Sequence, residues 1–158
     1  MVGLDYDSRQ LEDYRFVLQH LRSQIDKFEH HNQILLLGTS LGGYWCSQLS
    51  NIYECKKVLF NPCLFPSKML VKNLNRQQTI YATGERYIFT QTMLDALSEN
   101  ENNIYTDKTL CLLELGDEVL DNTLNQGVFQ NTISYEGGNH RFERFEEVLP
   151  LVSHLYYT

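Results

Sequence analysis

The 158-residue sequence lacks any apolar run long enough to cross a lipid bilayer. Its longest aliphatic stretch, 34–37, is far shorter than the roughly 20 apolar residues that a membrane-spanning helix needs. The chain also does not open with a basic segment followed by an apolar one, as a secretory signal does. We therefore expect a cytoplasmic protein that does not bind membranes.

Basic residues are also in short supply, with 13 Lys and Arg against 20 Asp and Glu and a net charge of −7. Such a charge repels a phosphate backbone unless a local basic cluster overcomes it, and no such cluster stands out. Nucleic acid is therefore not an expected partner. The 42% of hydrophobic and 21% of charged residues favour a buried core over intrinsic disorder. The length fits one domain over residues 1–158.

The four cysteines show neither CxxC spacing nor a neighbouring histidine cluster, so the sequence predicts neither a zinc site nor a disulfide framework. They are better interpreted as buried free thiols, at Cys46, Cys55, Cys63 and Cys111. The adjacent His30 and His31 do not share a helix face, and no further metal ligand lies near them at suitable spacing. We predict no bound metal and no cofactor.

Apolar segments without alternation are spaced along the chain and are separated by amphipathic ones. Such an apolar segment is typical of a strand covered on both faces, as in a parallel sheet. We predict strands of this kind at 33–38, 57–60 and 110–115, and a last strand at 132–135. Amphipathic helices are expected at 11–28, 41–53 and 145–156, with Pro150 kinking the last or ending its first half. The sequence therefore predicts an α/β fold with a mostly parallel sheet flanked by helices.

Three parts of the chain fit this pattern less regularly. Residues 1–6 alternate well enough for a short strand. Asn61 and Pro62 are expected to stop the second buried strand, because proline cannot donate to a strand ladder. Residues 62–108 are interpreted as a connecting or lid-like excursion of the same domain, with a helix at 86–97.

The segment 38–43, with the sequence GTSLGG, lies directly between a predicted buried strand and a predicted helix. A serine on so tight a turn is forced into strained backbone geometry, which small neighbours at Gly38 and Gly42 permit. Its hydroxyl then projects from the carboxyl edge of the sheet. The helix N-terminus offers free N–H groups to a developing oxyanion, first that of Leu41. Ser40 is therefore a candidate nucleophile.

Two other interpretations of segment 38–43 stay open at this point. In the first, Ser40 merely caps the helix within a glycine-rich packing turn. In the second, the segment is a phosphate-binding loop, which is a weaker alternative because no lysine follows the glycines. A base elsewhere in the chain that could accept the proton of the Ser40 hydroxyl would favour the nucleophile over both of these interpretations.

A nucleophilic serine needs a base and an acid that orients the base, and the chain supplies both in the order Ser, Asp, His. His140 lies in a glycine-rich loop after the last predicted strand, and Asp117 follows the preceding strand at a glycine turn. Glu118 and Asp121 are rival acids. We expect Glu118 to point away from the site and Asp121 to cap a helix. The leading prediction is a catalytic triad of Ser40, Asp117 and His140.

Four stretches, in the right order, resemble the YqiA/YcfP-like bacterial esterases of the α/β-hydrolase superfamily: LLLGTSLGGYW, VLFNPCLFP, LLELGDEVLD and EGGNHRF. The likeness runs from about residue 33 to the C-terminus. It implies a nucleophile at Ser40, an acid at Asp117 and a base at His140. It also implies that Asn61 and Pro62 shape the acyl side of a substrate pocket. The implied activity is hydrolysis of esters or thioesters of small acyl groups.

One feature of that family is missing from the sequence. The YqiA/YcfP-like proteins begin with an apolar strand and a His-Gly loop that supplies a second oxyanion N–H, and Met1 enters the pattern after that point. The strand at 33–38 then has an open edge, which residues 2–6, a second copy of the chain or residues upstream of Met1 would cover. Loss of one oxyanion donor costs about 10²–10³-fold in turnover. The alternative function is therefore a catalytically impaired binding or interaction module, with a homodimer through the sheet edge as one expected assembly.

Overall fold

The computed structural model describes residues 1–28, 33–80 and 82–158, which form two compact units. The helix–hairpin unit comprises Met1–Asn32 and Phe65–Asn102, and the sheet unit comprises Gln33–Leu64 and Asn103–Thr158. His30 and His31, the pair rejected as metal ligands on their spacing, lie outside the described residues. Within the described ranges, no helix has both the length and the apolar character needed to cross a bilayer.

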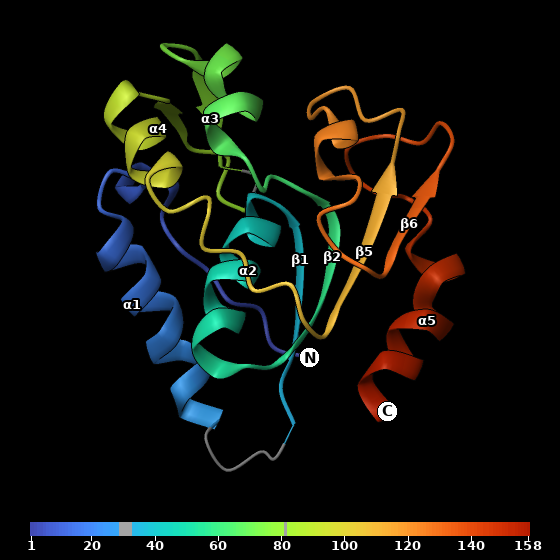
Figure 1. The fold of residues 1–158 in the computed structure, drawn as a ribbon. Helices are drawn as coiled ribbons and strands as arrows, with labels where there is room; N and C mark the ends of the chain where they lie inside the picture. Colours follow the sequence, from blue (N-terminus) through green and yellow to red (C-terminus); the bar gives the residue numbers. More distant parts are fainter. Residues whose placement is uncertain (29–32, 81) are drawn as a thin grey trace. The chain divides into compact units, whose positions relative to one another are not determined.

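The sheet unit is built on a four-stranded parallel sheet with the strand order β1-β2-β5-β6 (Figure 1). The α/β fold class and the four predicted strands are confirmed. Because the strands are parallel, the segments that follow them leave the sheet at one edge. The strands are β1 (Leu35–Ser40), β2 (Lys56–Pro62), β5 (Thr109–Glu114) and β6 (Thr132–Tyr135).

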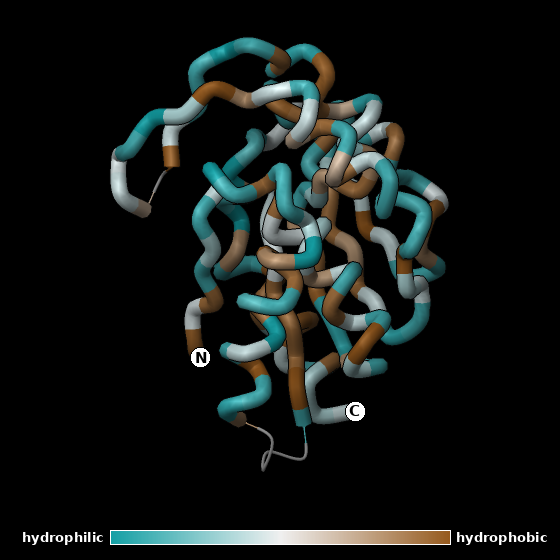
Figure 2. Tube along the Cα trace, turned by 90° about the vertical axis from the view of Figure 1, so that its left-hand side faces the viewer, coloured by the Kyte–Doolittle hydropathy of each residue, from teal (hydrophilic) through white to brown (hydrophobic). Residues whose placement is uncertain are grey.

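Helices α2 (Leu41–Tyr53) and α5 (Phe145–Tyr157) cover opposite faces of this sheet (Figure 1). On one face β1 lies so close to α2 that a side chain at Gly38 would meet Cys46. Strands β2 and β5 are buried along almost their whole length, as expected for strands covered on both faces, and Figure 2 shows that β1 begins as an apolar segment. On the other face, α5 and the strands form a core that includes Val58, Phe60, Leu112, Val148 and Val152.

Helix α5 passes through Pro150 without interruption, so the proline does not end its first half. Pro150 removes one backbone donor, and the carbonyl that loses its partner belongs to Glu146. Both residues are exposed, so water can hydrate that carbonyl. The exposed position of the proline therefore explains why the helix tolerates it.

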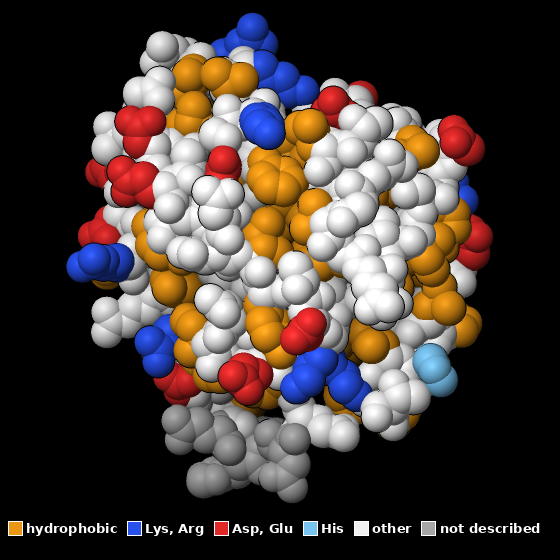
Figure 3. All heavy atoms as spheres, viewed as in Figure 1, with side chains coloured by type: hydrophobic (Ala, Val, Ile, Leu, Met, Phe, Trp, Pro, Cys, Tyr) orange, Lys and Arg blue, Asp and Glu red, His pale blue; other side chains and the backbone are white. Residues whose placement is uncertain are grey.

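The outward side of α5 carries apolar side chains, visible toward the right-hand edge of Figure 3. Phe145, Leu149 and Leu151 are 36%, 45% and 40% exposed. They flank the buried Val148 and Val152, which pack on the sheet. The helix is therefore apolar around more of its circumference than a typical surface helix.

Strand β2 is longer than the sequence predicts. It continues through Asn61 and Pro62, and Pro62 pairs with Ser40 across an irregularity at the end of β1. The missing proline donor does not break the contact, because the next N–H, that of Cys63, donates to the carbonyl of Ser40 at 2.9 Å. The expectation that Asn61 and Pro62 stop the strand is therefore wrong for the pairing with β1, whereas the pairing with β5 does end at Phe60 and β2 itself ends at Pro62.

The helix–hairpin unit consists of helices, short 3₁₀ turns and a two-stranded hairpin. Its second segment, Phe65–Asn102, lies within the excursion predicted at 62–108. The lid-like role of that excursion stays a prediction, as does the organisation of the chain as a single domain. The elements are η1 (Ser8–Gln10), α1 (Tyr14–Ile25), η2 (Asp26–Phe28), α3 (Pro66–Met69), η3 (Val71–Asn73), β3 (Gln77–Thr79), β4 (Arg86–Ile88) and α4 (Gln91–Ser98).

The helix expected at 86–97 begins only at Gln91. The residues before it form β4, which pairs antiparallel with β3 through Thr79 and Arg86 at one end and Gln77 and Ile88 at the other. The predicted helix is therefore wrong for residues 86–88. Their pairing partner, β3, lies before the segment 86–97, so the pattern within that segment does not indicate a strand.

Residues 1–6 form no strand, which corrects a further expectation. The side chain of Gln24 on α1 satisfies the backbone there instead, since Asp5 N–H donates to Gln24 Oε1 at 3.1 Å and Gln24 Nε2 donates to the Asp5 carbonyl at 2.7 Å. Residues 2–6 therefore add no strand beside β1, the end strand of the described sheet. A homodimer through that edge stays a prediction.

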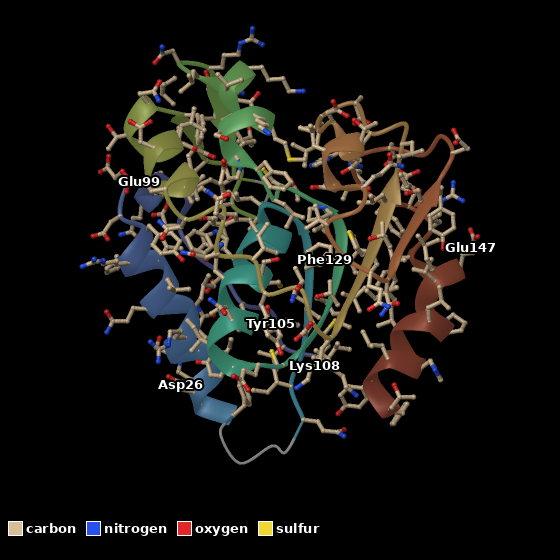
Figure 4. The ribbon with its side chains drawn as sticks, viewed as in Figure 1. Asp26, Glu99, Tyr105, Lys108, Phe129 and Glu147 are labelled. Carbon is tan, nitrogen blue, oxygen red and sulfur yellow. The ribbon has the colours of Figure 1, made fainter. Side chains whose placement is uncertain are left out.

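A fully buried lysine lies near the start of β2. Lys57 is 0% exposed, and its ammonium group donates to the backbone carbonyls of Tyr105 and Asp107. It also lies 4.8 Å and 5.8 Å from the ring centroids of Tyr105 and Phe129, both labelled in Figure 4. Burial lowers the pKa of Lys57 from 10.5 to about 8. The charged form is thus less favourable here than in water.

Replacing Lys57 with methionine should change stability in a way that depends on pH. Between about pH 8 and 10.5 the unfolded chain binds more protons at Lys57 than the folded chain does. The cost of burying the charge is therefore full below this window and disappears above it. The free energy of unfolding of Lys57→Met, relative to the wild type, should fall across the window by an amount on the order of 2 kcal/mol.

Denaturant unfolding of both proteins at matched pH measures this difference. The wild type alone does not suffice, because burial also raises the pKa of Cys46 and Cys111 to about 12 and so changes the alkaline stability of both proteins. A stability difference between Lys57→Met and wild type that is constant from neutral pH to above the window would contradict a buried charge.

Candidate active site

Ser40 forms a sharp corner between a strand and a helix. β1 ends at Ser40 and α2 begins at Leu41, with no loop between them. Ser40 has φ 53° and ψ −125°, a conformation that residues with a side chain adopt rarely. Its carbonyl accepts a hydrogen bond from Cys63 N–H, which ties the corner to the end of β2. This backbone geometry is the strained turn that the sequence predicts.

The Ser40 side chain does not cap the helix that follows it. Ser40 occupies the N-cap position of α2, yet in the described part of the chain its side chain makes no capping hydrogen bond. The residue is half-buried. The interpretation of Ser40 as a helix cap is therefore not supported. Leu41, the predicted oxyanion donor, is the first residue of α2, where backbone N–H groups have no partner within the helix.

The tight packing at the corner depends on Gly38 and Gly43. A side chain at Gly38 would approach the Gly42 carbonyl oxygen to 2.5 Å and Cys46 Sγ to 2.7 Å, and one at Gly43 would approach Pro62 to 2.6 Å. A side chain at Gly42 meets nothing within 4 Å. The predicted steric need is confirmed at Gly38. It is wrong at Gly42, because the helix approaches β2 most closely one residue later.

Gly38→Ala should therefore lower the stability of the protein, whereas Gly42→Ala should not. The first change overpacks the junction of β1 and α2, which costs about 1–3 kcal/mol. The second adds a methyl group in open space and improves helix propensity by up to about 1 kcal/mol. Thermal and denaturant unfolding of both variants checks this, and equal losses of stability would contradict the packing described for the corner.

Asp117 and His140 meet at the carboxyl edge of the sheet. Asp117 follows β5, His140 follows β6, and the carboxylate oxygens lie 2.8 and 3.0 Å from His140 Nδ1. The Asp117 side chain is completely buried, and that of His140 is 17% exposed. A carboxylate at Nδ1 favours the tautomer with a proton on Nδ1, which leaves Nε2 as an acceptor. The pair therefore has the geometry of a base and the acid that orients it.

Three further donors hold the Asp117 carboxylate. Oδ1 accepts hydrogen bonds from the N–H groups of Val119 and Leu120 at 2.8 Å each, and Oδ2 accepts one from Asn122 Nδ2 at 3.1 Å. Burial by itself would raise the pKa of Asp117. The hydrogen bonds from His140 and from the two backbone N–H groups outweigh burial and lower this pKa. The carboxylate is therefore ionised at neutral pH, as an orienting acid must be.

The two rival acids have other contacts. Asp121 caps the short helix η4 (Asn122–Asn125) by accepting from Thr123 N–H at 3.1 Å, as predicted. Glu118 was expected to point away, but its Oε2 accepts a hydrogen bond from the backbone N–H of His140 at 3.1 Å. That expectation is wrong because the histidine loop lies against the turn after β5. Glu118 thus binds the backbone of His140 and not its ring.

Ser40 lies at the same edge of the sheet as the Asp117–His140 pair. It leaves β1 opposite Pro62 of β2, and the neighbouring Asn61 contacts the backbone of His140. Among the hydrogen bonds of the described residues, none joins the Ser40 hydroxyl to the His140 ring. The contact between nucleophile and base stays a prediction. Such contacts are often long in enzymes without substrate and tighten when substrate binds.

A second buried carboxylate at this edge, Glu114, was missed by the sequence interpretation. Glu114 is 2% exposed; Oε1 accepts from Arg144 Nε and Oε2 from Asn139 N–H, both at 2.7 Å. A side chain at Gly138 would collide with Glu114, so glycine is required where the loop crosses it. The sequence did contain a signal for this residue, a glutamate at the end of an apolar strand. A charge buried there needs a partner, so a bound cation or donor could have been predicted. No comparable signal marked Asn122 or Arg144.

Asn61 and Pro62 lie at the end of β2, and both are buried. The Pro62 carbonyl accepts a hydrogen bond from Asn125 Nδ2 at 2.7 Å, and the Asn61 amide bonds to neighbouring segments of the sheet unit. The role of these two residues as a wall of the substrate pocket stays a prediction. The complete burial of Asn61 favours an internal role for that side chain.

Sequence comparison relates the chain to a group of bacterial proteins. The model of a family described as an uncharacterised protein family, UPF0227, matches residues 4–156. The chain belongs to the UPF0227 family. The family member YcfP of Salmonella paratyphi A is 28% identical over 138 residues, which cover 84% of this chain and 71% of that protein. The resemblance to YcfP-like proteins is thus confirmed. The chain spans 56% of the length of the first matching relatives, from Pectobacterium species.

The fold of this UPF0227 chain is similar to that of solved α/β-hydrolase structures. Est1E from Butyrivibrio proteoclasticus matches with a TM-score of 0.67 at 14% sequence identity, over 89% of this chain and 68% of that one. A monoacylglycerol lipase from Paleococcus ferrophilus matches with a TM-score of 0.61 at 14% identity, over 89% and 75% of the two chains. At such low identity the likeness establishes the fold alone.

Proposed function

We propose that this protein is a serine hydrolase that cleaves carboxylic esters or thioesters of small acyl groups. The observation that carries the proposal is the corner at Ser40, a serine with φ 53° between a parallel strand and a helix that it does not cap. Backbone strain of this kind persists where the surrounding structure enforces it, most often at functional sites. The Asp117–His140 pair at the same edge of the sheet supplies the base that such a serine needs.

In the proposed mechanism, His140 Nε2 takes the proton of the Ser40 hydroxyl as Oγ attacks the acyl carbonyl. Asp117 keeps the imidazole oriented and stabilises the imidazolium that forms. The N–H of Leu41, at the start of α2, stabilises the negative charge on the carbonyl oxygen. His140 then gives the proton to the leaving alcohol or thiol. Water, activated by His140 in the same way, hydrolyses the ester that joins the acyl group to Ser40.

Turnover of model substrates tests this function. The wild-type chain should hydrolyse p-nitrophenyl esters and acyl thioesters with short acyl groups faster than those with long ones, measured by the release of nitrophenolate and of free thiol. No turnover above the buffer rate for either class would contradict the proposal. If calorimetry then shows that the chain still binds an acyl ligand, the hydrolase-like binding module becomes the better description.

A further inference from the structure

We infer that Asn61 is a positioning residue that anchors the loop carrying His140 and thereby places the base. Its catalytic meaning rests on the proposed function, whereas its contacts do not. Asn61 lies at the end of β2, one residue before Pro62, which pairs with Ser40. Its side chain is 0% exposed, and both ends of its amide bond to neighbouring segments of the sheet unit.

The nitrogen of the Asn61 amide binds the histidine loop. Nδ2 donates to the backbone carbonyl of Asn139 at 2.9 Å and to that of His140 at 3.4 Å. These carbonyls belong to the base itself and to the residue before it, so the loop backbone is tied to β2. Asp117 holds the ring of His140 separately. The backbone at His140 and its ring are thus held by separate contacts.

The oxygen of the same amide binds the acid side of the site. The backbone pairing between β2 and β5 ends before Asn61. Beyond that point, Asn61 Oδ1 accepts from the Glu114 N–H at 2.7 Å and from Asn122 Nδ2 at 2.9 Å. Asn122 also donates to the Asp117 carboxylate at 3.1 Å. One amide group therefore connects the segment that holds the acid with the loop that holds the base.

Carboxylates bind the opposite polar groups of the same two loop residues. The N–H of Asn139 donates to Glu114 and the N–H of His140 donates to Glu118. Both carboxylates come from the end of β5 or the turn that follows it. The contacts of Glu114 and Glu118 tie the loop only to β5 and its turn. Asn61 ties the loop to β2, which lies next to β1, the strand that ends at Ser40.

Asparagine suits this position for two physical reasons. Asn61 has φ 42°, in the left-handed region where asparagine is tolerated better than most residues with a side chain. Its amide also combines donors and an acceptor in one planar group, as the loop carbonyls and the Glu114 N–H require. A buried polar group that loses its partner is costly, so the loss of either half of the amide should be measurable.

Asn61→Asp tests the donor half of this side chain separately from its acceptor half. The variant keeps an oxygen for the Glu114 N–H and for Asn122 but turns the donor toward the loop into an acceptor that faces two carbonyls. We expect kcat on a p-nitrophenyl ester to fall about 10²-fold with KM within about threefold, because a small displacement of a catalytic group has an effect of that size. The proton NMR signal of His140 Nδ1–H, bound to Asp117, should broaden or disappear.

Val58→Ala is the matched control, since it truncates a fully buried side chain in the same strand and destabilises the protein, while the apolar side chain that it shortens makes no hydrogen bond to the loop. It should keep kcat within about threefold and retain the His140 signal. If Asn61→Asp does not fold, Asn61→Ser, which is too short to reach the loop carbonyls, replaces it with the same expected losses.

Three results would overturn the positioning role of Asn61: wild-type kcat in a folded Asn61→Asp protein, an equal loss of kcat in Val58→Ala, or an unchanged His140 signal in the Asn61 variants. The NMR comparison also decides the matter if the wild type hydrolyses no ester. Loss of the signal in the Asn61 variants alone would then support the positioning role while the proposed function fails.

Discussion

Replacing Ser40 with alanine should abolish hydrolysis of every ester or thioester that the wild type turns over, with a loss of about 10⁴–10⁶-fold in kcat. Without Oγ no acyl intermediate forms, and His140 has no proton to take. The fold should survive, because the change removes one oxygen from a half-buried residue that makes no capping bond. Initial rates at saturating substrate, with a thermal melt of the same sample, measure both expectations.

A second serine provides the control for this variant. Ser50 lies on α2 and is fully buried, and its hydroxyl donates to the Ser47 carbonyl at 3.0 Å. Ser50→Ala should keep kcat within about twofold, even if it lowers the melting temperature. A Ser40→Ala protein that retains a tenth or more of the wild-type kcat would contradict the role of Ser40 as nucleophile.

Asp117→Asn should lower kcat by about 10³–10⁴-fold and leave KM nearly unchanged. An asparagine oxygen can still accept the N–H groups of Val119 and Leu120, so the turn should stay folded. Its NH₂ group then faces His140 Nδ1 and favours the tautomer with the proton on Nε2, which cannot accept a proton from Ser40. Steady-state kinetics on the best ester found for the wild type measures this effect.

Asp121→Asn is the matched control, because it makes the same chemical change four residues away at an exposed helix cap. Asparagine is as good an N-cap as aspartate, so kcat and stability should both stay close to the wild-type values. A similar loss of kcat in Asp117→Asn and Asp121→Asn would point to a general effect of lost charge, not to the orientation of His140.

Patterns that reflect local burial were sufficient to predict the frame of the sheet unit. Helix α2 is found at Leu41–Tyr53, where an apolar face follows the glycine turn, and β6 at Thr132–Tyr135. The corner at Ser40 is equally local, since it depends on small residues between a buried strand and a helix. Asp117 could be ranked first among the acids because it follows β5 at a glycine turn.

Contacts between residues distant in the sequence explain what the patterns did not reveal. Asn61 bonds to Glu114 and Asn122, 53 and 61 positions away, and neither residue carries a periodic signal. The direction of Glu118 likewise depends on how the histidine loop lies against the turn after β5. The short strands of the hairpin were missed because each has only three residues, too few for alternation to be recognised.

Mass spectrometry after reaction with a fluorophosphonate tests most directly whether Ser40 is an activated nucleophile. Such a reagent modifies a serine that a neighbouring base has activated. We expect a single adduct on the wild-type chain, mapped to the peptide that contains Ser40, formation of that adduct at a much lower rate in Asp117→Asn, and no adduct on Ser40→Ala. A wild-type chain that stays unmodified while an established serine esterase reacts under the same conditions, or equal modification of wild type and Ser40→Ala, would contradict the account.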